Sequence, residues 1–303
     1  MRMRVLASMA LLMALPLFAR AQNAQEVLRQ IEEADKNTVI ELSEDLEMTG
    51  VLRNAHGAEI TLQGVSDEPV RLYGLSIDQG TFYIDNAAML PSPEDEEGKT
   101  ALAIRGEADV TIRHNAFVQG DVSMESEETA FLRCYGGVMG TVNASGGPGA
   151  QVNVVNPGRI GRLSLRGRDA WMRFANTGLV EEGVYLSASG SEGGVTLSNA
   201  QEAVIAGDVI CRANHYRGDY AAVTIENEGR IDGCVEAAGT AVLVDYGLVQ
   251  GGIRTRRGER AEGFIYVYLP RVSPDDARSR ARACHNAYKH YQADPRDVCF
   301  RFE

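Results

Sequence analysis

Cysteine, positive charge and long apolar runs are scarce in this 303-residue chain, and each shortage excludes a class of protein. The five cysteines include no C-x-x-C pair and no paired His and Cys spacing, so nothing predicts zinc, iron or a redox centre. We therefore expect no metal and no cofactor. The net charge of −12 argues against nucleic acid, or an anionic membrane surface, as the general partner.

The only long apolar run lies at the N-terminus. Two arginines precede an apolar stretch over residues 5–18, and residues 19–21 form an A-x-A cleavage pattern, so we predict a signal peptide over residues 1–21. The mature chain would begin at Gln22 and be exported to the cell surface, the extracellular space or the periplasm. No later run is long enough to span a bilayer, so no membrane span is expected.

A degenerate repeat runs through the second half of the chain. In each unit two apolar residues at i and i+2 are followed by Asn or Tyr, then Gly, then a second aliphatic pair. The units begin at Val152, Met172, Val195, Val223 and Val242, with a looser unit at Phe131. An interval of roughly 20 residues is typical of solenoids, and alternation with period two predicts strands. Each repeat should be one turn, with inward aliphatic columns as the core.

Asparagine and glycine recur at fixed places in this repeat. Four asparagines share one register: Asn156, Asn176, Asn199 and Asn227. They predict a ladder of side-chain hydrogen bonds along the stack, in preference to a row of sugar-binding amides. Four glycines separate the two apolar pairs: Gly158, Gly178, Gly229 and Gly247. We expect each to allow a sharp bend or a positive φ.

Helices are predicted at both ends of the solenoid. Asn23 to Asp35 has apolar residues at helical spacing and leads directly into a strand that begins at Thr38. At the other end, Ser273 and Pro274, followed by two aspartates, make a helix start. That second helix should lie over the last turn and cover its unpaired edge.

Two cysteines near the C-terminus flank a predicted turn. Cys284 lies in the predicted last helix and Cys299 lies beyond the turn, so we predict a disulfide between them that holds the terminal tail. Cys211 and Cys234 lie in neighbouring repeats without stacking, and Cys134 is a candidate core residue. The pairing of these three is left open.

The N-terminal helix, the strand VIELSEDLEM and Gly50 resemble the start of right-handed parallel β-helix proteins of the pectin-lyase-like superfamily. The second-half repeats resemble those of secreted adhesins and autotransporter passenger domains. This resemblance implies an all-β, right-handed parallel β-helix of about ten turns over residues 22–270. A helical cap over residues 271–303 would complete the chain. The resemblance implies architecture, and function only by analogy.

Two functions remain open after this resemblance. One is a noncatalytic, adhesin-like protein that binds glycan or a surface protein; the other is a polysaccharide lyase or glycoside hydrolase, for which alone calcium would be a cofactor. The predicted repeats contain no D-D pair, since the one in the chain belongs to the predicted C-terminal helix, and there is no D-x-D or G-H-G run; this favours the first. The weak catalytic candidates are Asp208, Asp232, Asp245 and Arg230, which fall at different registers. An acid cluster on one face of the solenoid would favour the enzyme. A face of Thr, Ser and Asn would favour the binding protein.

The longest insertion between clear repeats, Cys211 to Tyr220, is the predicted binding loop. Its aromatic and charged residues are His215, Tyr216, Arg217, Asp219 and Tyr220. Exposed aromatics beside charged groups are used in sugar and protein contacts, and the segment Arg-Gly-Asp within this loop resembles an integrin-binding tripeptide.

A second binding candidate is a basic patch in the last loop. It comprises Arg254, Arg256, Arg257 and Arg260. Such a patch would hold a carboxylate or sulfate, although a solvated loop explains it equally. The identity of the partner and the oligomeric state do not follow from the sequence.

Overall fold

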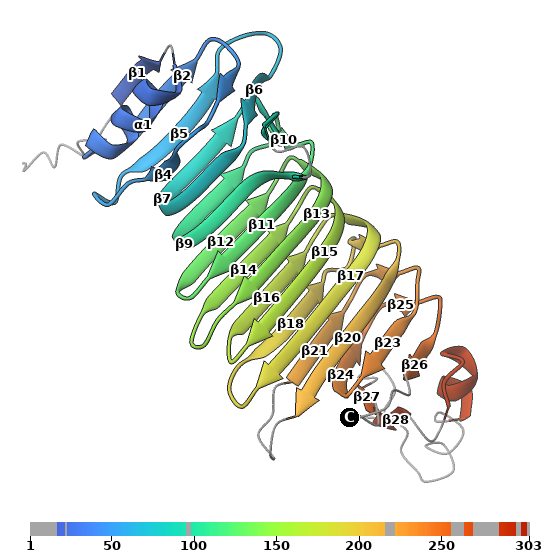
Figure 1. The fold of residues 1–303 in the computed structure, drawn as a ribbon. Coiled ribbons are helices and arrows are strands. Elements are labelled where there is room, and N and C mark those ends of the chain that lie inside the picture. The colour runs from blue at the N-terminus through green and yellow to red at the C-terminus, as the bar shows by residue number, and fades with distance from the viewer. Residues whose placement is uncertain are drawn as a thin grey trace, which may run out of the picture.

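The computed structural model describes residues 17–21, 23–94, 98–215, 222–255, 264–268, 285–294 and 298–301. Most of them belong to a parallel β-solenoid of about nine turns, which forms the elongated body in Figure 1. The predicted fold class, an all-β parallel β-helix, is confirmed. Each turn contributes strands to three faces, and each strand pairs in parallel with the strand at the same place in the next turn.

The first face contains the strand that opens each sequence repeat. Its strands are β1 (Leu17–Ala21), β2 (Thr38–Leu42), β5 (Glu59–Gly64), β12 (Thr129–Cys134), β14 (Gln151–Asn156), β16 (Trp171–Asn176), β18 (Gly194–Asn199), β21 (Ala222–Asn227), β24 (Thr240–Asp245), β27 (Phe264–Tyr268) and β28 (Val298–Arg301). The second face is narrow. Its strands are β3 (Leu46–Glu47), β6 (Val70–Tyr73), β8 (Ala87–Leu90), β10 (Phe117–Val118), β19 (Val204–Ile205), β22 (Arg230–Ile231) and β25 (Leu248–Val249).

The third face follows the second around a corner. Its own strands are β4 (Val51–Arg53), β11 (Asp121–Ser126), β20 (Asp208–His215), β23 (Val235–Ala238) and β26 (Ile253–Thr255). Five longer strands bend and belong to two faces. β7 (Leu75–Asp85) and β9 (Thr100–Ile112) run from the third face to the first, whereas β13 (Gly137–Gly146), β15 (Arg159–Arg168) and β17 (Leu179–Gly190) run from the second to the third.

The register of the first face confirms the sequence repeat and corrects it at both ends. The inward column contains Val152, Met172, Val195 and Val223, as predicted. The next residue is Ala241 rather than Val242, and the preceding one is Ala130 rather than Phe131. Because side chains alternate across a strand, a shift of one residue exchanges the buried and the solvent side. Phe131 and Val242 are accordingly half-buried, while Ala130 and Ala241 belong to the core.

Buried asparagines form the predicted ladder at the ends of the first-face strands. Each side-chain amide donates to Oδ1 of the next over 2.8 to 2.9 Å, in the order Asn156, Asn176, Asn199 and Asn227. The corrected register adds a fifth member, since Asn227 donates over 2.8 Å to a carboxylate oxygen of Asp245. All five side chains are buried. The amides therefore donate in one direction along the stack, and the series ends on a carboxylate, the strongest acceptor among side chains.

The glycines beside this ladder have a different role from the predicted one. In the described chain none of the four has a positive φ. Instead, a Cβ at Gly178 would overlap the carbonyl oxygen of Gly158 in the previous turn, and a Cβ at Gly247 would overlap that of Gly229. Glycine is needed because the backbones of consecutive turns touch at this corner.

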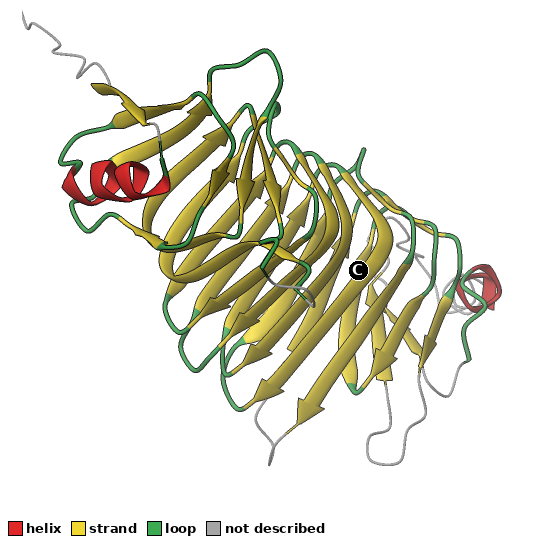
Figure 2. Cartoon of the chain, turned by 45° about the horizontal axis from the view of Figure 1, so that its top comes forward, coloured by secondary structure: helices red, strands yellow, loops and turns green. Residues whose placement is uncertain are grey.

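Helix α1 (Ala24–Glu33) covers the N-terminal end of the core, as predicted, and is the helix at the left of Figure 2. The Asn23 side chain caps it by accepting a hydrogen bond from the backbone N–H of Glu26 over 2.9 Å. Ile31 is fully buried. The Asn54 amide donates to the carbonyl oxygens of Ile31 and Ala34, over 2.7 and 2.8 Å, and so satisfies acceptors at the helix end.

The strand before α1 comes from the predicted signal peptide. β1 pairs in parallel with β2, from Leu17 opposite Thr38 to Ala21 opposite Leu42. The signal peptide and export remain predictions. Cleavage after Ala21 would remove β1 and leave β2 as the first strand of the stack.

The C-terminal cap is described in part. Residues 285–290 are helical, whereas the predicted helix start at Ser273 and residue Cys284 lie outside the described residues. Cys299 is a free thiol, so the predicted disulfide between Cys284 and Cys299 is not formed. Cys299 lies within β28, opposite Tyr266, and main-chain pairing with β27 holds the tail instead. No helix in the described part of the chain is long and apolar enough to cross a membrane.

Replacing one ladder amide should destabilise the protein far more than replacing an exposed one. Asn176→Ala would leave Nδ2 of Asn156 and Oδ1 of Asn199 buried without their partners, at a cost of about 2–4 kcal/mol. The control is Asn143→Ala, an exposed amide on the third face, which should change stability by less than about 0.5 kcal/mol. Urea unfolding followed by circular dichroism measures both. Equal losses in the two variants would contradict the ladder's role.

Candidate functional site

Asp245, one of the predicted catalytic acids, is a structural residue. It is buried at the end of the ladder, where it also accepts a hydrogen bond from the backbone N–H of Gly247 over 3.1 Å. The Tyr291 hydroxyl, from the C-terminal cap, donates to its other oxygen over 2.5 Å. With both oxygens engaged inside the stack, this carboxylate does not face solvent as a catalytic group must.

The other predicted catalytic residues do not join Asp245. Arg230, at the start of β22 on the second face, pairs with Asp232 at 2.8 Å between Nε and Oδ1. Asp208 begins β20 on the third face and accepts a hydrogen bond from the backbone N–H of Cys234 over 2.8 Å. The three aspartates thus occupy three different places in the turn: the end of a first-face strand, the corner after the second face and the start of the third.

The predicted binding loop is only partly described. His215 ends β20 opposite Gly190, and its side chain, with residues 216–220, lies outside the described residues. The predictions on Tyr216, Arg217, Asp219 and Tyr220 therefore remain untested. In the predicted basic patch, Arg256, Arg257 and Arg260 also lie outside the described residues. Arg254 is described, and it is paired: its Nε lies 2.9 Å from a Glu236 carboxylate oxygen.

The three cysteines whose pairing was left open are free and buried. Burial raises the pKa of the Cys134 and Cys211 thiols to about 12. Burial, with a contribution from Asp208, raises the pKa of Cys234 to about 11. Cys211 stands opposite Ala237 rather than Cys234, so the two thiols do not stack. Protonated at neutral pH, these cysteines serve as small core side chains.

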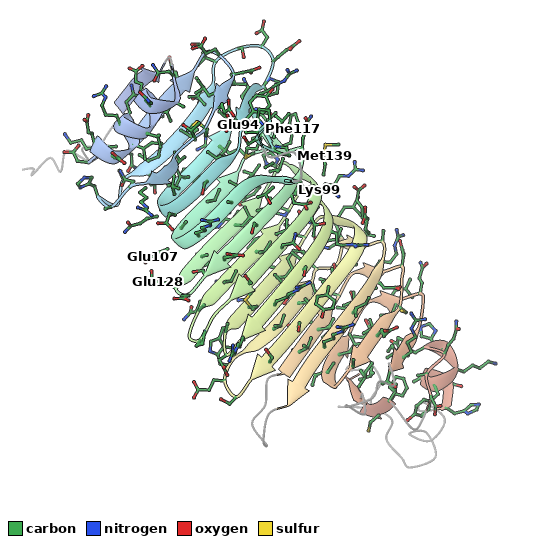
Figure 3. The ribbon with its side chains drawn as sticks, viewed as in Figure 1. Glu94, Lys99, Glu107, Phe117, Glu128 and Met139 are labelled. Carbon is green, nitrogen blue, oxygen red and sulfur yellow. The ribbon has the colours of Figure 1, made fainter. Side chains whose placement is uncertain are left out.

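The third face carries a groove of about 470 Å³ across β13, β15, β17 and β20. Outward side chains at successive turns stack in register along it: Asn143, Ser164, Tyr185 and Ile210. Turns of parallel strands are about 4.8 Å apart, so these four positions extend over roughly 14 Å along the axis. In Figure 3 the third face runs between the labelled Phe117 and Met139, on the side of the second face, and the labelled Glu107 and Glu128, at the corner with the first face.

Tyr185 lies in this groove between two arginines. The guanidinium carbons of Arg166 and Arg212 are each 5.5 Å from the centre of its ring. Both arginines stand opposite Ser187, one in the turn before it and one in the turn after it. The arginines come from the turns on either side of β17, and each makes a cation–π contact with the same tyrosine ring, which favours ordered guanidinium groups.

Two further arginines of this region are paired with acids. Arg162 lies 3.3 Å from a Glu182 carboxylate oxygen, and both line the groove. Arg254, in the turn beyond β23, lies 4.0 Å from a carboxylate oxygen of Asp208 in addition to its contact with Glu236. These exposed pairs add little to stability, but they neutralise the acids of the groove.

Sequence reasoning did not select Tyr185, Arg166 or Arg212. The sequence repeat is defined by its apolar positions, asparagines and glycines, while these residues are outward positions on third-face strands, where the corners vary in length. Their signal is the alternation of arginine and serine at one outward position in three successive turns. That signal appears only after the register of the third face is known.

Removing the Tyr291 hydroxyl should weaken the cap and change its response to alkali. Tyr291→Phe would leave one Asp245 oxygen buried without its donor, at a cost of about 1–3 kcal/mol. Burial, and then Asp245, raises the pKa of Tyr291 well above its usual value near 10. A raised pKa means that this stabilisation is complete below about pH 10 and declines as the pH rises further, because only the unfolded chain then ionises.

The measurement is the difference in unfolding midpoint between wild type and Tyr291→Phe from pH 8 to pH 11. The difference should shrink above about pH 10. Tyr246→Phe, at the exposed neighbour of Asp245, serves as the control and should match wild type throughout. A constant difference across this range would contradict the role given to the Tyr291 proton.

Within the described residues, no group of three or more His, Cys, Asp or Glu side chains is placed to hold a metal ion. The comparisons with known proteins add no family: no family model matches the chain, and neither a curated protein nor a solved structure matches it. The parallel β-solenoid fold therefore stands on the structure alone. The third-face groove combines amide, hydroxyl, phenol, carboxylate and guanidinium groups.

Proposed function

We propose that this protein is an exported, noncatalytic, adhesin-like β-solenoid that binds glycan along the third-face groove. The observation that carries the proposal is the polar lining of that groove, which includes Tyr185 and Arg166, with Arg212 beside them in contact with the same tyrosine ring. Hydroxyl, amide and guanidinium groups at successive turns offer hydrogen bonds at a regular spacing. A polymer of polar units, repeated along its length, is the ligand that such a spacing suits.

The chemistry of the lining favours glycan over protein as the partner. Only two aliphatic side chains, Val184 and Ile210, are among the residues that line the groove. The core of a protein interface is enriched in aromatic side chains, Met and Arg, and depleted in Ser, Asp and Glu, whereas this groove includes a serine and two acids. Thr141, Asn143 and Ser164 instead supply the small polar groups that the sequence associates with a binding face.

The groove is supported from beneath by the core. Leu163 and Leu165 on β15 and Leu186 on β17 point inward and are fully buried. Their outward neighbours on the same strands are thereby held at fixed positions, and main-chain pairing on both sides limits their movement. A binding site placed on paired strands in this way needs little reordering when a ligand binds.

One observation favours a polysaccharide-cleaving enzyme as the second candidate. Glu182 and Asp208 both line the groove, and glycoside hydrolysis uses two carboxyl groups. Each of these carboxylates already lies at an arginine, Glu182 at Arg162 and Asp208 at Arg254. We therefore rank binding above catalysis.

The test combines the purified protein with a panel of soluble plant, algal and host polysaccharides, with and without calcium. Size-exclusion chromatography with light scattering then reports complex formation and polymer length together. Intact polymer that coelutes with protein supports the proposal. Shortened polymer, with activity lost in Glu182→Gln or Asp208→Asn, would establish the enzyme instead. If no polymer in the panel either coelutes with the protein or becomes shorter, the glycan proposal is overturned.

Replacing Tyr185 should weaken binding of any polymer that coelutes. Tyr185→Ala removes both the phenol and the ring that orders two guanidinium groups, so we expect a loss of at least about tenfold in affinity. The matched control is Tyr83→Ala on the first face, where Arg113 lies 5.0 Å from the ring centre in the same kind of contact. Titration calorimetry measures both variants. Loss of affinity in the control alone would place the site on the first face.

A further inference from the structure

Arg166 and Arg212 differ from most other described arginines in their lack of a partner. Ion pairs within 4.0 Å join arginines to acids on all three faces, among them Arg53 to Asp78 and Arg113 to Asp85. Arg166 and Arg212 have no carboxylate within that distance among the described residues. Both side chains are exposed, and both residues are aligned with Ser187 across neighbouring strands. In a chain with a net charge of −12, two neighbouring cations without a partner are unusual.

The acids near the groove do not compensate these two charges. Glu182 is engaged by Arg162, and Asp208 and Glu236 by Arg254, at 3.3, 4.0 and 2.9 Å. Arg166, which lines the groove, and Arg212, which contacts Tyr185 at its side, thus have no carboxylate partner among the described residues. Both stand beside the same tyrosine ring, so their mutual repulsion is maintained by the fold.

The positions around Ser187 match the needs of an anionic group. Arg166, Ser187 and Arg212 stand in register at three successive turns, with the serine in the middle. Outward side chains at this column would surround an anion with two guanidinium groups and a hydroxyl. Guanidinium groups bind carboxylate and sulfate through paired N–H donors, and no described carboxylate within 4.0 Å occupies the donors of these two arginines.

We propose that the groove recognises an acidic glycan, whose carboxylate or sulfate substituent binds between Arg166 and Arg212 above Ser187. This inference rests on the proposed glycan-binding function and specifies the ligand class of the same groove. It also places the anion site on the third face, apart from the basic patch predicted from the sequence, of which the described member Arg254 is neutralised.

The experiment compares dextran, carboxymethyl dextran and dextran sulfate of matched length, which share one backbone and differ in the anionic group. Titrations use wild-type protein, the double variant Arg166→Gln/Arg212→Gln, and the control Arg71→Gln/Arg173→Gln. The control removes the same charge from two exposed arginines on the second and first faces, in β6 and β16, away from the groove. Thermal unfolding checks that all variants are folded.

We expect wild type and control to bind at least one charged dextran at least about tenfold more tightly than dextran, with affinity falling as salt rises. The Arg166→Gln/Arg212→Gln variant should lose that advantage. Comparison of the two charged dextrans tells carboxylate from sulfate recognition. Equal loss in the control would reduce the effect to net charge and overturn the inference.

Failure of this inference is distinguishable from failure of the proposed function. Binding of neutral and charged polymers with equal affinity, unchanged in the double variant, would overturn the acidic ligand while glycan binding stands. Absence of binding to all three dextrans, and to every polymer of the wider panel, would overturn both proposals.

Discussion

The buried amide ladder from Asn156 to Asp245 is the interaction on which the register of the C-terminal turns depends. Columns of Val, Leu and Ile can slip along one another by two residues and still bury apolar side chains. An amide cannot, because a slipped ladder leaves donors and acceptors buried without partners, each costing about 1–3 kcal/mol. Hydrogen bonds of 2.8 to 2.9 Å at every step therefore select one alignment of successive turns. The outward positions of the next faces follow from it.

The corners between faces adjust the turns without disturbing that alignment. Ile160 stands opposite Val180, but Arg162 stands opposite Gly183, so β17 accommodates one additional residue at the corner. Gly183 takes a φ of +136° there, which a residue with a Cβ rarely adopts. The additional residue allows Glu182 to reach the groove and meet Arg162. A feature of the groove thus arises from a local irregularity between two regular faces.

The two ends of the ladder differ: the C-terminal end is bonded to a polar group of the cap, and the N-terminal end meets apolar side chains. At the C-terminal end Asp245 receives hydrogen bonds from Asn227 and Tyr291, so the same polar series connects the stack to its cap. At the other end the column becomes apolar, since Cys134 precedes Asn156 and Ile112 precedes Cys134. Oδ1 of Asn156 has no hydrogen-bond partner among the described residues. The N-terminal turns rely on aliphatic packing alone at this position.

The sequence predicted those parts of the fold that repeat with an unbroken period. The solenoid, the ladder of four asparagines and the N-terminal helix follow from residue spacing, because each position in such a pattern meets its own kind in the next turn. The repeats beginning at Phe131 and Val242 were misaligned by one residue, since Cys134 and Asp245 replace asparagine at the ladder position. That single shift is why Asp245 resembled an exposed catalytic acid. The disulfide prediction depended on spacing alone, and spacing does not reveal that the Cys299 thiol is free within β28.

The groove combines a rigid floor with an open surface, and this combination limits the ways in which it can act on a ligand. Its side chains stand on paired strands whose spacing is set by the turn, so it cannot close over a ligand and exclude water as many active sites do. Its acids are paired with arginines, whereas Arg166 and Arg212, on either side of Tyr185 along the stack, have no carboxylate within 4.0 Å among the described residues. A polymer that meets such a surface gains affinity from several modest contacts at once, each set at a fixed distance from the last. Binding through contacts repeated at fixed distances requires no movement of the protein, and a stack of similar turns provides such contacts directly.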